Sequence, residues 1–192
     1  MNWWTAAPSA PIRRKVFISY YRGDRTAVDA FVAYWAGVQN VFIPQIVGAY
    51  GEDIINSDDA EYVIGQIRTR HIADSTVTMV LIGSCTHSRR HVDWEIKASL
   101  RQGEVYTPNG LLGIILPYQG TTAFLPPRFE ANWIRENRDC YTRYYIAPSM
   151  PEELRSWIED AYGARTTRAT FIRNPVETMR YNGRCRVCSL TH

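Results

Sequence analysis

The chain has 192 residues, enough to bury the core of one domain, and its formal net charge is +3 at pH 7. So small a charge gives no argument for nucleic-acid binding, although Arg outnumbers Lys by twenty to two and the planar guanidinium suits phosphate groups. No apolar stretch approaches the roughly 20 residues that span a bilayer, and residues 1–11 lack the basic start and long apolar run of a secretory signal. We therefore expect a cytoplasmic protein that binds neither membrane nor nucleic acid.

The first part of the chain reads as strand, helix and strand. Residues 16–20 form a short apolar run typical of a strand, and apolar side chains then recur at helical spacing over 24–36. Residues 42–47 can form the second strand, although Pro44 interrupts it because proline has no backbone N–H to donate.

The middle of the chain contains the clearest strand. After a loop over 48–56, Ser57 is the expected N-cap of a helix that continues to residue 73. Residues 76–82 are mostly apolar, which predicts a fully buried strand. Residues 91–101 carry apolar side chains at helical spacing, which predicts a helix.

The last elements complete an alternating pattern. Residues 111–116 and 141–146 predict two further strands, and Ser149 is the expected N-cap of a final helix over 151–162. Short apolar strands separated by helices predict an α/β domain, with a mostly parallel central sheet and helices on both faces.

Glu95 is the residue that most needs an explanation. At 100° per residue, Val92, Ile96 and Leu100 form an apolar stripe, and Glu95 falls beside it, one turn after His91. A carboxylate at that place, near a helix N-terminus at the mouth of a sheet, can be partly buried and still reach a ligand. The alternative is a glutamate that only favours the helix dipole.

Four motifs occur in the order and spacing of TIR domains: KVFISYY at 15–21, VLIGS at 80–84, RRHVDWEI at 89–96 and GIILP at 113–117. The longer phrase VLIGSCTHSRR is similar to that of the compact TIR-like proteins typified by ThsB of the Thoeris anti-phage system. The resemblance covers residues 13–163 and implies a flavodoxin-like TIR fold, with an N-terminal extension at 1–12 and a basic C-terminal tail at 164–192.

The resemblance also implies an activity. Such a protein cleaves NAD+ at the nicotinamide–ribose bond, without a cofactor, and makes a cyclic ADP-ribose-type signal that activates a separate effector, with a phage component as a possible trigger. Glu95 would be catalytic. Ordinary glycosidases need a second carboxyl group to protonate the leaving group, but nicotinamide leaves as a neutral molecule, so one carboxylate that stabilises the cationic transition state is enough. The alternative is a non-enzymatic TIR module that signals by self-association.

Two further segments are expected at the same cleft as Glu95. Ser19, Tyr20 and Tyr21 leave the first strand and Ser84 leaves the third at the edge where helix 91–101 begins, which is where such sheets bind ligands. Either tyrosine can stack on a flat ring of NAD+, but Tyr20 can also point into the core, because successive residues of a strand face opposite sides. Ser84 can also simply begin a turn.

Arg22 and His91 complete the expected substrate-binding set. Arg22 can contact the diphosphate, although Arg22, Gly23 and Asp24 also read as an ordinary turn in which Asp24 caps the next helix. His91 can orient Glu95 or lie on the surface. The family often has an aromatic residue, commonly Trp, at the position of His91, so this chain departs from the pattern beside the pocket.

Four cysteines in a chain of this size do not form a disulfide framework. Cys85 and Cys140 each lie near a strand and are expected to be reduced packing residues. Cys185, Cys188 and His192 have spacing suited to three corners of a zinc site, but no second CxxC pair supplies the rest. We therefore expect no metal and a disordered C-terminal end.

The tail is also expected to be solvated and dispensable for folding. Only Glu177 opposes its positive charges, which are arginines 165, 168, 173, 180, 184 and 186.

Overall fold

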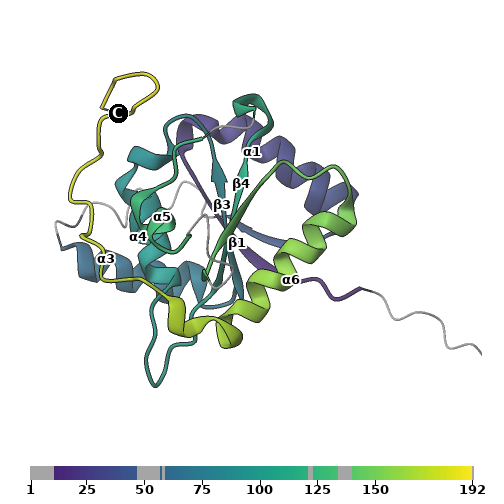
Figure 1. Cartoon of the computed structure of the whole chain (residues 1–192), viewed down its shortest axis with the longest axis horizontal. Helices are drawn as coiled ribbons and strands as arrows, with labels where there is room; N and C mark the ends of the chain where they lie inside the picture. Colours follow the sequence, from purple (N-terminus) through teal and green to yellow (C-terminus); the bar gives the residue numbers. More distant parts are fainter. Residues whose placement is uncertain (1–10, 47–56, 58, 121–122, 134–139, 192) are drawn as a thin grey trace, which may run out of the picture.

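The computed structural model describes residues 11–46, 57, 59–120, 123–133 and 140–191. Most of the expected N-terminal extension, the expected loop at 48–56 and His192 lie outside the described residues. Figure 1 shows a central sheet with helices on both sides. No helix in the described part of the chain is both long and apolar enough to cross a membrane.

The sheet has five strands: β1 (Lys15–Tyr20), β2 (Ile43–Ile46), β3 (Val77–Ile82), β4 (Gly110–Ile115) and β5 (Arg143–Ile146). All neighbouring strands are parallel, in the order β2-β1-β3-β4-β5. This is the flavodoxin-like order, so the predicted fold class is confirmed. Pro44 lies in the edge strand β2, where a missing N–H is tolerated.

Four of the five helices match the predicted pattern, and α5 was not predicted. The helices are α1 (Arg25–Val32), α3 (Ala60–Ile67), α4 (Arg90–Ser99), α5 (Pro127–Ala131) and α6 (Pro151–Thr167). Turns of π-helix extend α1 over Ala33–Val38 and α3 over Arg68–Ile72. Short 3-10 turns lie at Arg22–Asp24, Thr86–Ser88, Pro117–Gln119 and Ala169–Phe171.

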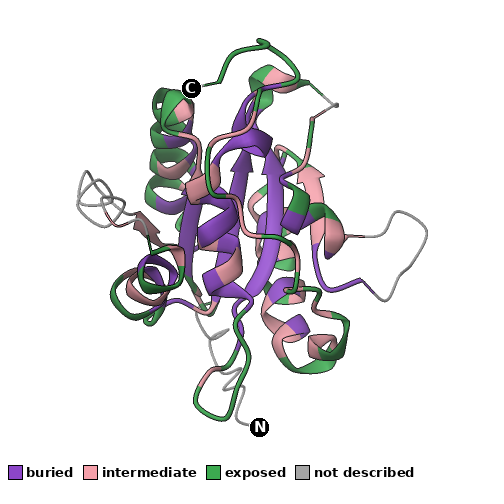
Figure 2. Ribbon diagram, turned by 90° about the vertical axis from the view of Figure 1, so that its left-hand side faces the viewer, coloured by how far each residue is buried: buried purple, intermediate pink, exposed green. Residues whose placement is uncertain are grey.

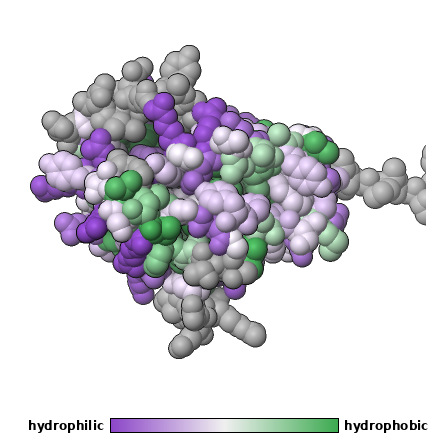
Figure 3. Space-filling view, turned by 90° about the horizontal axis from the view of Figure 1, so that it is seen from above, coloured by the Kyte–Doolittle hydropathy of each residue, from purple (hydrophilic) through white to green (hydrophobic). Residues whose placement is uncertain are grey.

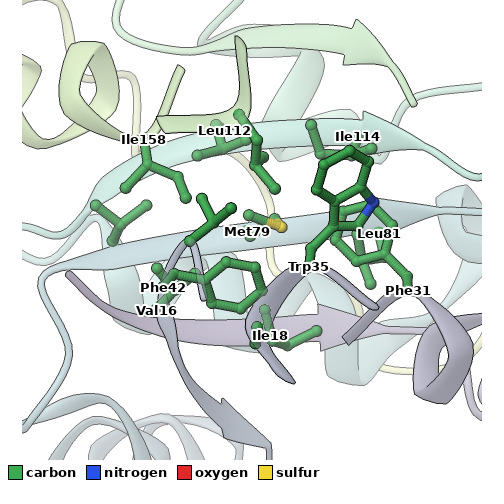
Figure 4. Close-up of a cluster of buried hydrophobic side chains, with 14 of the residues drawn as sticks. Val16, Ile18, Phe31, Trp35, Phe42, Met79, Leu81, Leu112, Ile114 and Ile158 are labelled. Carbon is green, nitrogen blue, oxygen red and sulfur yellow. The ribbon is translucent and has the colours of Figure 1, made fainter. Parts of the chain in front are cut away.

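Two layers of helices bury the sheet. Side chains of α1 and α6 share one apolar cluster with the sheet, whereas α3, α4 and α5 cover the other face. Every residue of β3 and β4 is buried, and Figure 2 shows these strands as the buried centre of the molecule. Figure 4 shows the cluster on the α1 side, where Trp35 and Phe31 lie against Leu81 and Ile114. Burying each such side chain stabilises the fold by about 1.5–3 kcal/mol.

Two predicted N-caps differ from the structure. Asp59, not Ser57, caps α3: its carboxylate accepts from the backbone N–H groups of Glu61 and Tyr62. The Ser57 hydroxyl instead accepts from the N–H of Asp59. At α6 the N-cap is Met150 rather than Ser149. The carboxylate of Glu153, in the first turn of α6, accepts from the backbone N–H groups of Ser149 and Met150.

Arg173, Arg180, Arg184 and Arg186 are exposed, as expected of a solvated tail, but the backbone of the tail packs on the domain. Helix α6 continues to Thr167, past the expected boundary at residue 163, and the chain beyond it runs along α3 and α4 (Figure 1). The buried guanidinium of Arg128, on α5, donates to the carbonyls of Asn174 and Val176. The indole of Trp94, on α4, donates to the carbonyl of Met179 at 2.8 Å. Hydrogen bonds to its backbone therefore hold the tail against the domain.

Candidate functional site at the carboxyl edge of β1 and β3

The winding of the sheet changes direction between β1 and β3. The connection from β1 to β2 passes through α1 on one face, and the connection from β3 to β4 passes through α4 on the other. Because the two connections diverge, the carboxyl ends of β1 and β3 border a place where parallel sheets bind ligands.

Ser19 and Glu95 meet at this place. Ser19 is fully buried and faces α4, because it lies two residues after Phe17, which packs against α3 and α4. Its hydroxyl donates to Oε2 of Glu95 at 2.6 Å. The predicted position of Glu95, beside the apolar stripe and partly buried, is found in the structure.

The environment of Glu95 favours the neutral acid. Burial removes the carboxylate from water and raises its pKa to about 8, although the hydrogen bond from Ser19 acts in the opposite direction. No lysine or arginine among the described residues forms a salt bridge with it. A buried acid without a cation is costly for the fold and is suited to meet a cationic ligand.

His91 and Tyr20 lie beside this pair in different ways. The pKa of His91 is lowered by burial, and the ring forms a hydrogen bond with the backbone of Tyr20, so a neutral imidazole lies one turn before Glu95. The ring of Tyr20 packs with the cluster on the α1 side of the sheet, opposite Ser19. Tyr20 therefore meets His91 through its backbone, while its ring lies on the other face of the sheet.

The remaining expected residues form the rim. The guanidinium carbon of Arg89 lies 4.3 Å from the centroid of the Tyr21 ring, a cation–π contact between the end of β1 and the start of α4. Arg22 is exposed in the short turn after Tyr21. Ser84 accepts a hydrogen bond from the side-chain amide of Gln119. The structure thus brings Ser19, His91 and Glu95 together.

Sequence reasoning missed a second polar cluster at this edge. Asp24 occupies the N-cap position of α1 but makes no side-chain cap hydrogen bond, so the predicted capping role is wrong. Instead Oδ1 accepts from the hydroxyl of Tyr118 at 2.6 Å and Oδ2 from that of Thr86 at 3.4 Å. Burial raises the pKa of Asp24. A Cβ on Gly83 would lie 2.2 Å from Oδ2 of Asp24 and 2.3 Å from the hydroxyl of Tyr118, so a larger residue there would displace these two side chains.

A buried ion pair fixes the first turn of α4. Arg128 and Asp93 are almost completely buried, and the guanidinium donates to both carboxylate oxygens at 2.8 and 3.3 Å. The backbone N–H of Met179 donates to the same carboxylate at 3.0 Å. Nothing in the sequence pattern distinguishes Asp93 from an ordinary first-turn acid, so only the structure identifies this pair as the anchor of the helix that carries Glu95.

Figure 3 looks down on the molecule from the side toward which the strands point. Hydrophobic and hydrophilic side chains are interspersed on this face, without one broad apolar area. Such a surface suits a polar ligand better than a hydrophobic one.

The family described as the TIR-like domain of the Thoeris protein ThsB matches residues 17–121. This span runs from Phe17 within β1 to beyond the end of β4, and it includes Glu95 and both polar clusters. No curated protein matches the chain. Because the match covers more than half of the 192 residues, the chain belongs to the ThsB TIR-like family.

Proposed function

We propose that this ThsB-like TIR domain cleaves NAD+ at the nicotinamide–ribose bond and produces a cyclic ADP-ribose-type signal. The observation that carries the proposal is the buried carboxyl of Glu95, which receives a hydrogen bond from Ser19 and lies at the sheet edge without a cationic partner among the described residues. The proposed role in Thoeris-type defence rests on the family. The proposed cleavage of NAD+ rests on the Glu95 carboxyl and its surroundings.

The reaction suits a single carboxylate. The bond between C1′ of the ribose and the pyridinium nitrogen breaks, its electron pair neutralises the ring, and nicotinamide leaves without needing a proton. The ribose develops the positive charge of an oxocarbenium ion, which a nearby carboxylate stabilises. A nucleophilic atom of the same ADP-ribose then bonds to C1′, and one proton is released. Water attacking instead would give ADP-ribose.

The substrate itself would ionise Glu95. The free site holds the acid largely neutral at pH 7, because its pKa is raised to about 8. A pyridinium ring placed beside the carboxyl lowers that pKa, since an opposite charge favours the ionised form. Ser19 would then hold one carboxylate oxygen in place while the other faces the ribose.

Other residues are assigned binding roles in the same proposal. Tyr21, held against Arg89, is the tyrosine better placed to stack on a flat ring of NAD+, because Tyr20 packs on the opposite face of the sheet. Arg22 is exposed beside the end of β1 and would contact the diphosphate. Ser84 would bind substrate at the end of β3, and neutral His91 would keep Glu95 in position.

The proposed partners follow from the activity. The product would diffuse to a separate effector protein and activate it, and a phage component would switch the domain on. No cofactor is needed, because NAD+ is the substrate. The reaction is expected in the cytoplasm, where NAD+ and the effector meet the protein.

The test is nicotinamide release from NAD+, with the nucleotide product identified by mass spectrometry. The purified protein is assayed alone and in lysate from phage-infected cells, beside Glu95→Gln. Release that needs Glu95 supports the proposal. If neither condition gives release, while the protein self-associates in a concentration-dependent way, the domain is a signalling module without enzymatic activity.

A further inference from the structure

Three thiols from distant parts of the chain meet beside the end of β3. Sγ of Cys85 lies 2.9 Å from Sγ of Cys185 and 3.5 Å from Sγ of Cys188. All three sulfur atoms lie within 4.8 Å of one another, and this is the only such group of potential metal ligands in the described part of the chain. The sequence alone groups Cys185 and Cys188 with His192 and predicts Cys85 to be a packing residue.

The tail makes a defined turn to bring its cysteines to Cys85. The N–H of Gly183 donates to the carbonyl of Ser88 at 2.8 Å, which fixes the tail beside the turn that follows β3. Within the tail, the N–H of Cys185 donates to the carbonyl of Leu190 at 2.8 Å, and that of Ser189 donates back to Cys185 at 2.9 Å. A closed turn therefore presents both sulfur atoms toward Cys85.

His87 lies against the same turn. Its side chain is only 7% exposed, and its Nε2 accepts from the N–H of Arg186, between the two tail cysteines, at 3.1 Å. Because Nε2 accepts that hydrogen bond, Nδ1 of the neutral ring carries the proton, and neither ring nitrogen offers a free lone pair to a metal. His87 therefore holds the turn that carries the two tail cysteines.

We propose that Cys85, Cys185 and Cys188 bind one zinc ion through their three sulfur atoms. Zinc–sulfur bonds of about 2.3 Å place the sulfur atoms of a tetrahedral site about 3.8 Å apart. The observed separations of 2.9 and 3.5 Å need only a small expansion to reach that value. On binding, the thiols lose their protons to solvent, and the ion replaces three S–H groups with three zinc–thiolate bonds.

The ligand spacing supports a site that joins the tail to the domain. Cys185 and Cys188 are separated by two residues, a chelating spacing found in zinc sites, and Cys85 supplies the third thiolate from an opposite part of the chain. Water would fill the fourth position of the tetrahedron. The ion would fasten the tail to the turn between β3 and α4, and this inference does not depend on NAD+ cleavage.

The direct test is elemental analysis of the full chain, purified under reducing conditions without added metal. We expect about one zinc per chain. Cys188→Ser should remove the zinc and lower the melting temperature by several degrees; because Cys188 is exposed, this change leaves the core intact. Cys140→Ser is the matched control, since Cys140 is buried and donates to the carbonyl of Thr142, and it should keep the zinc.

Further measurements make the outcome decisive. Cobalt substituted for zinc should give thiolate charge-transfer bands and the intense visible bands of a tetrahedral ion. The proposal is overturned if reduced protein titrated with Zn²⁺ binds none. It is also overturned if the intact mass is two hydrogens low because Cys85 and Cys185 form a disulfide, or if Cys140→Ser loses the metal as fully as Cys188→Ser.

Discussion

Replacing Glu95 with Gln should abolish activity and stabilise the fold at the same time. The amide keeps the shape of the side chain and still accepts from Ser19, but it cannot oppose a developing positive charge. Loss of such an electrostatic interaction typically slows turnover on the order of a hundredfold or more.

The stability gain follows from the raised pKa of Glu95. In the unfolded chain the acid titrates near 4.5, whereas in the folded protein its pKa is about 8. Between these values the unfolded state loses its proton first, so the free energy of unfolding falls as pH rises from about 4.5 to 8 and then levels. At 1.36 kcal/mol per pH unit the ceiling is about 5 kcal/mol. Because Glu95 as a whole residue is only half-buried, we expect roughly 1–3 kcal/mol.

The assay is thermal unfolding of wild type and Glu95→Gln at pH 5 and pH 8. The variant should melt roughly 2–10 °C higher at pH 8, and the gain should shrink at pH 5. Glu104→Gln, at an exposed position, is the control and should change neither melting temperature nor turnover. Equal melting temperatures of wild type and Glu95→Gln at pH 8 would refute the conclusion that the acid is buried without a cationic partner. Turnover at the wild-type rate in Glu95→Gln would refute the catalytic role of Glu95.

Three further predictions concern the same helix and its supports. The kcat/KM for NAD+ should rise with pH and level off above about 8, as Glu95 of the free protein ionises. The Ser19 hydroxyl lowers the pKa of Glu95, so Ser19→Ala should move that rise to higher pH. A pH-independent kcat/KM would contradict this assignment. Asp93→Asn should lower the free energy of unfolding by about 3–5 kcal/mol in urea denaturation, since it leaves the charge of Arg128 buried and unpaired; a change below about 1 kcal/mol would mean that the pair is not buried in solution. Deleting the chain from residue 172 onward should lower the melting temperature markedly, because Arg128 loses the tail carbonyls and Trp94 loses Met179, and an unchanged melting temperature would show that the tail does not pack.

The periodic elements were predictable because their pattern arises from burial. The apolar run at 76–82 predicted β3, and the stripe through Val92, Ile96 and Leu100 placed Glu95 beside the core. The side of the sheet on which Tyr20 lies was not predictable, because a strand alternates its faces and the sequence does not say which face meets which helix. The structure shows that the Tyr20 ring packs on the face of the sheet that α1 covers.

The tail could not be predicted for a different reason. Arg128 and Trp94 of the domain donate hydrogen bonds to backbone carbonyls of the tail. Every residue has a backbone carbonyl, so the sequence of the tail does not reveal these contacts. A basic, weakly apolar segment therefore reads as solvated even when the domain binds its backbone. Cys85 was missed as a neighbour of Cys185 for a related reason, since about a hundred residues separate them and only the fold brings them together.

Three consecutive residues of α4 explain how a single carboxylate can be held so far from water. At 100° per residue, Asp93, Trp94 and Glu95 point in three directions: Asp93 meets Arg128 of α5, Trp94 donates to the tail, and Glu95 meets Ser19 of β1. The helix is therefore fixed from two sides before it presents Glu95 to the sheet. Two of its anchors, α5 and the tail, lie outside residues 17–121, so the environment of Glu95 depends on parts of the chain that the family match does not include.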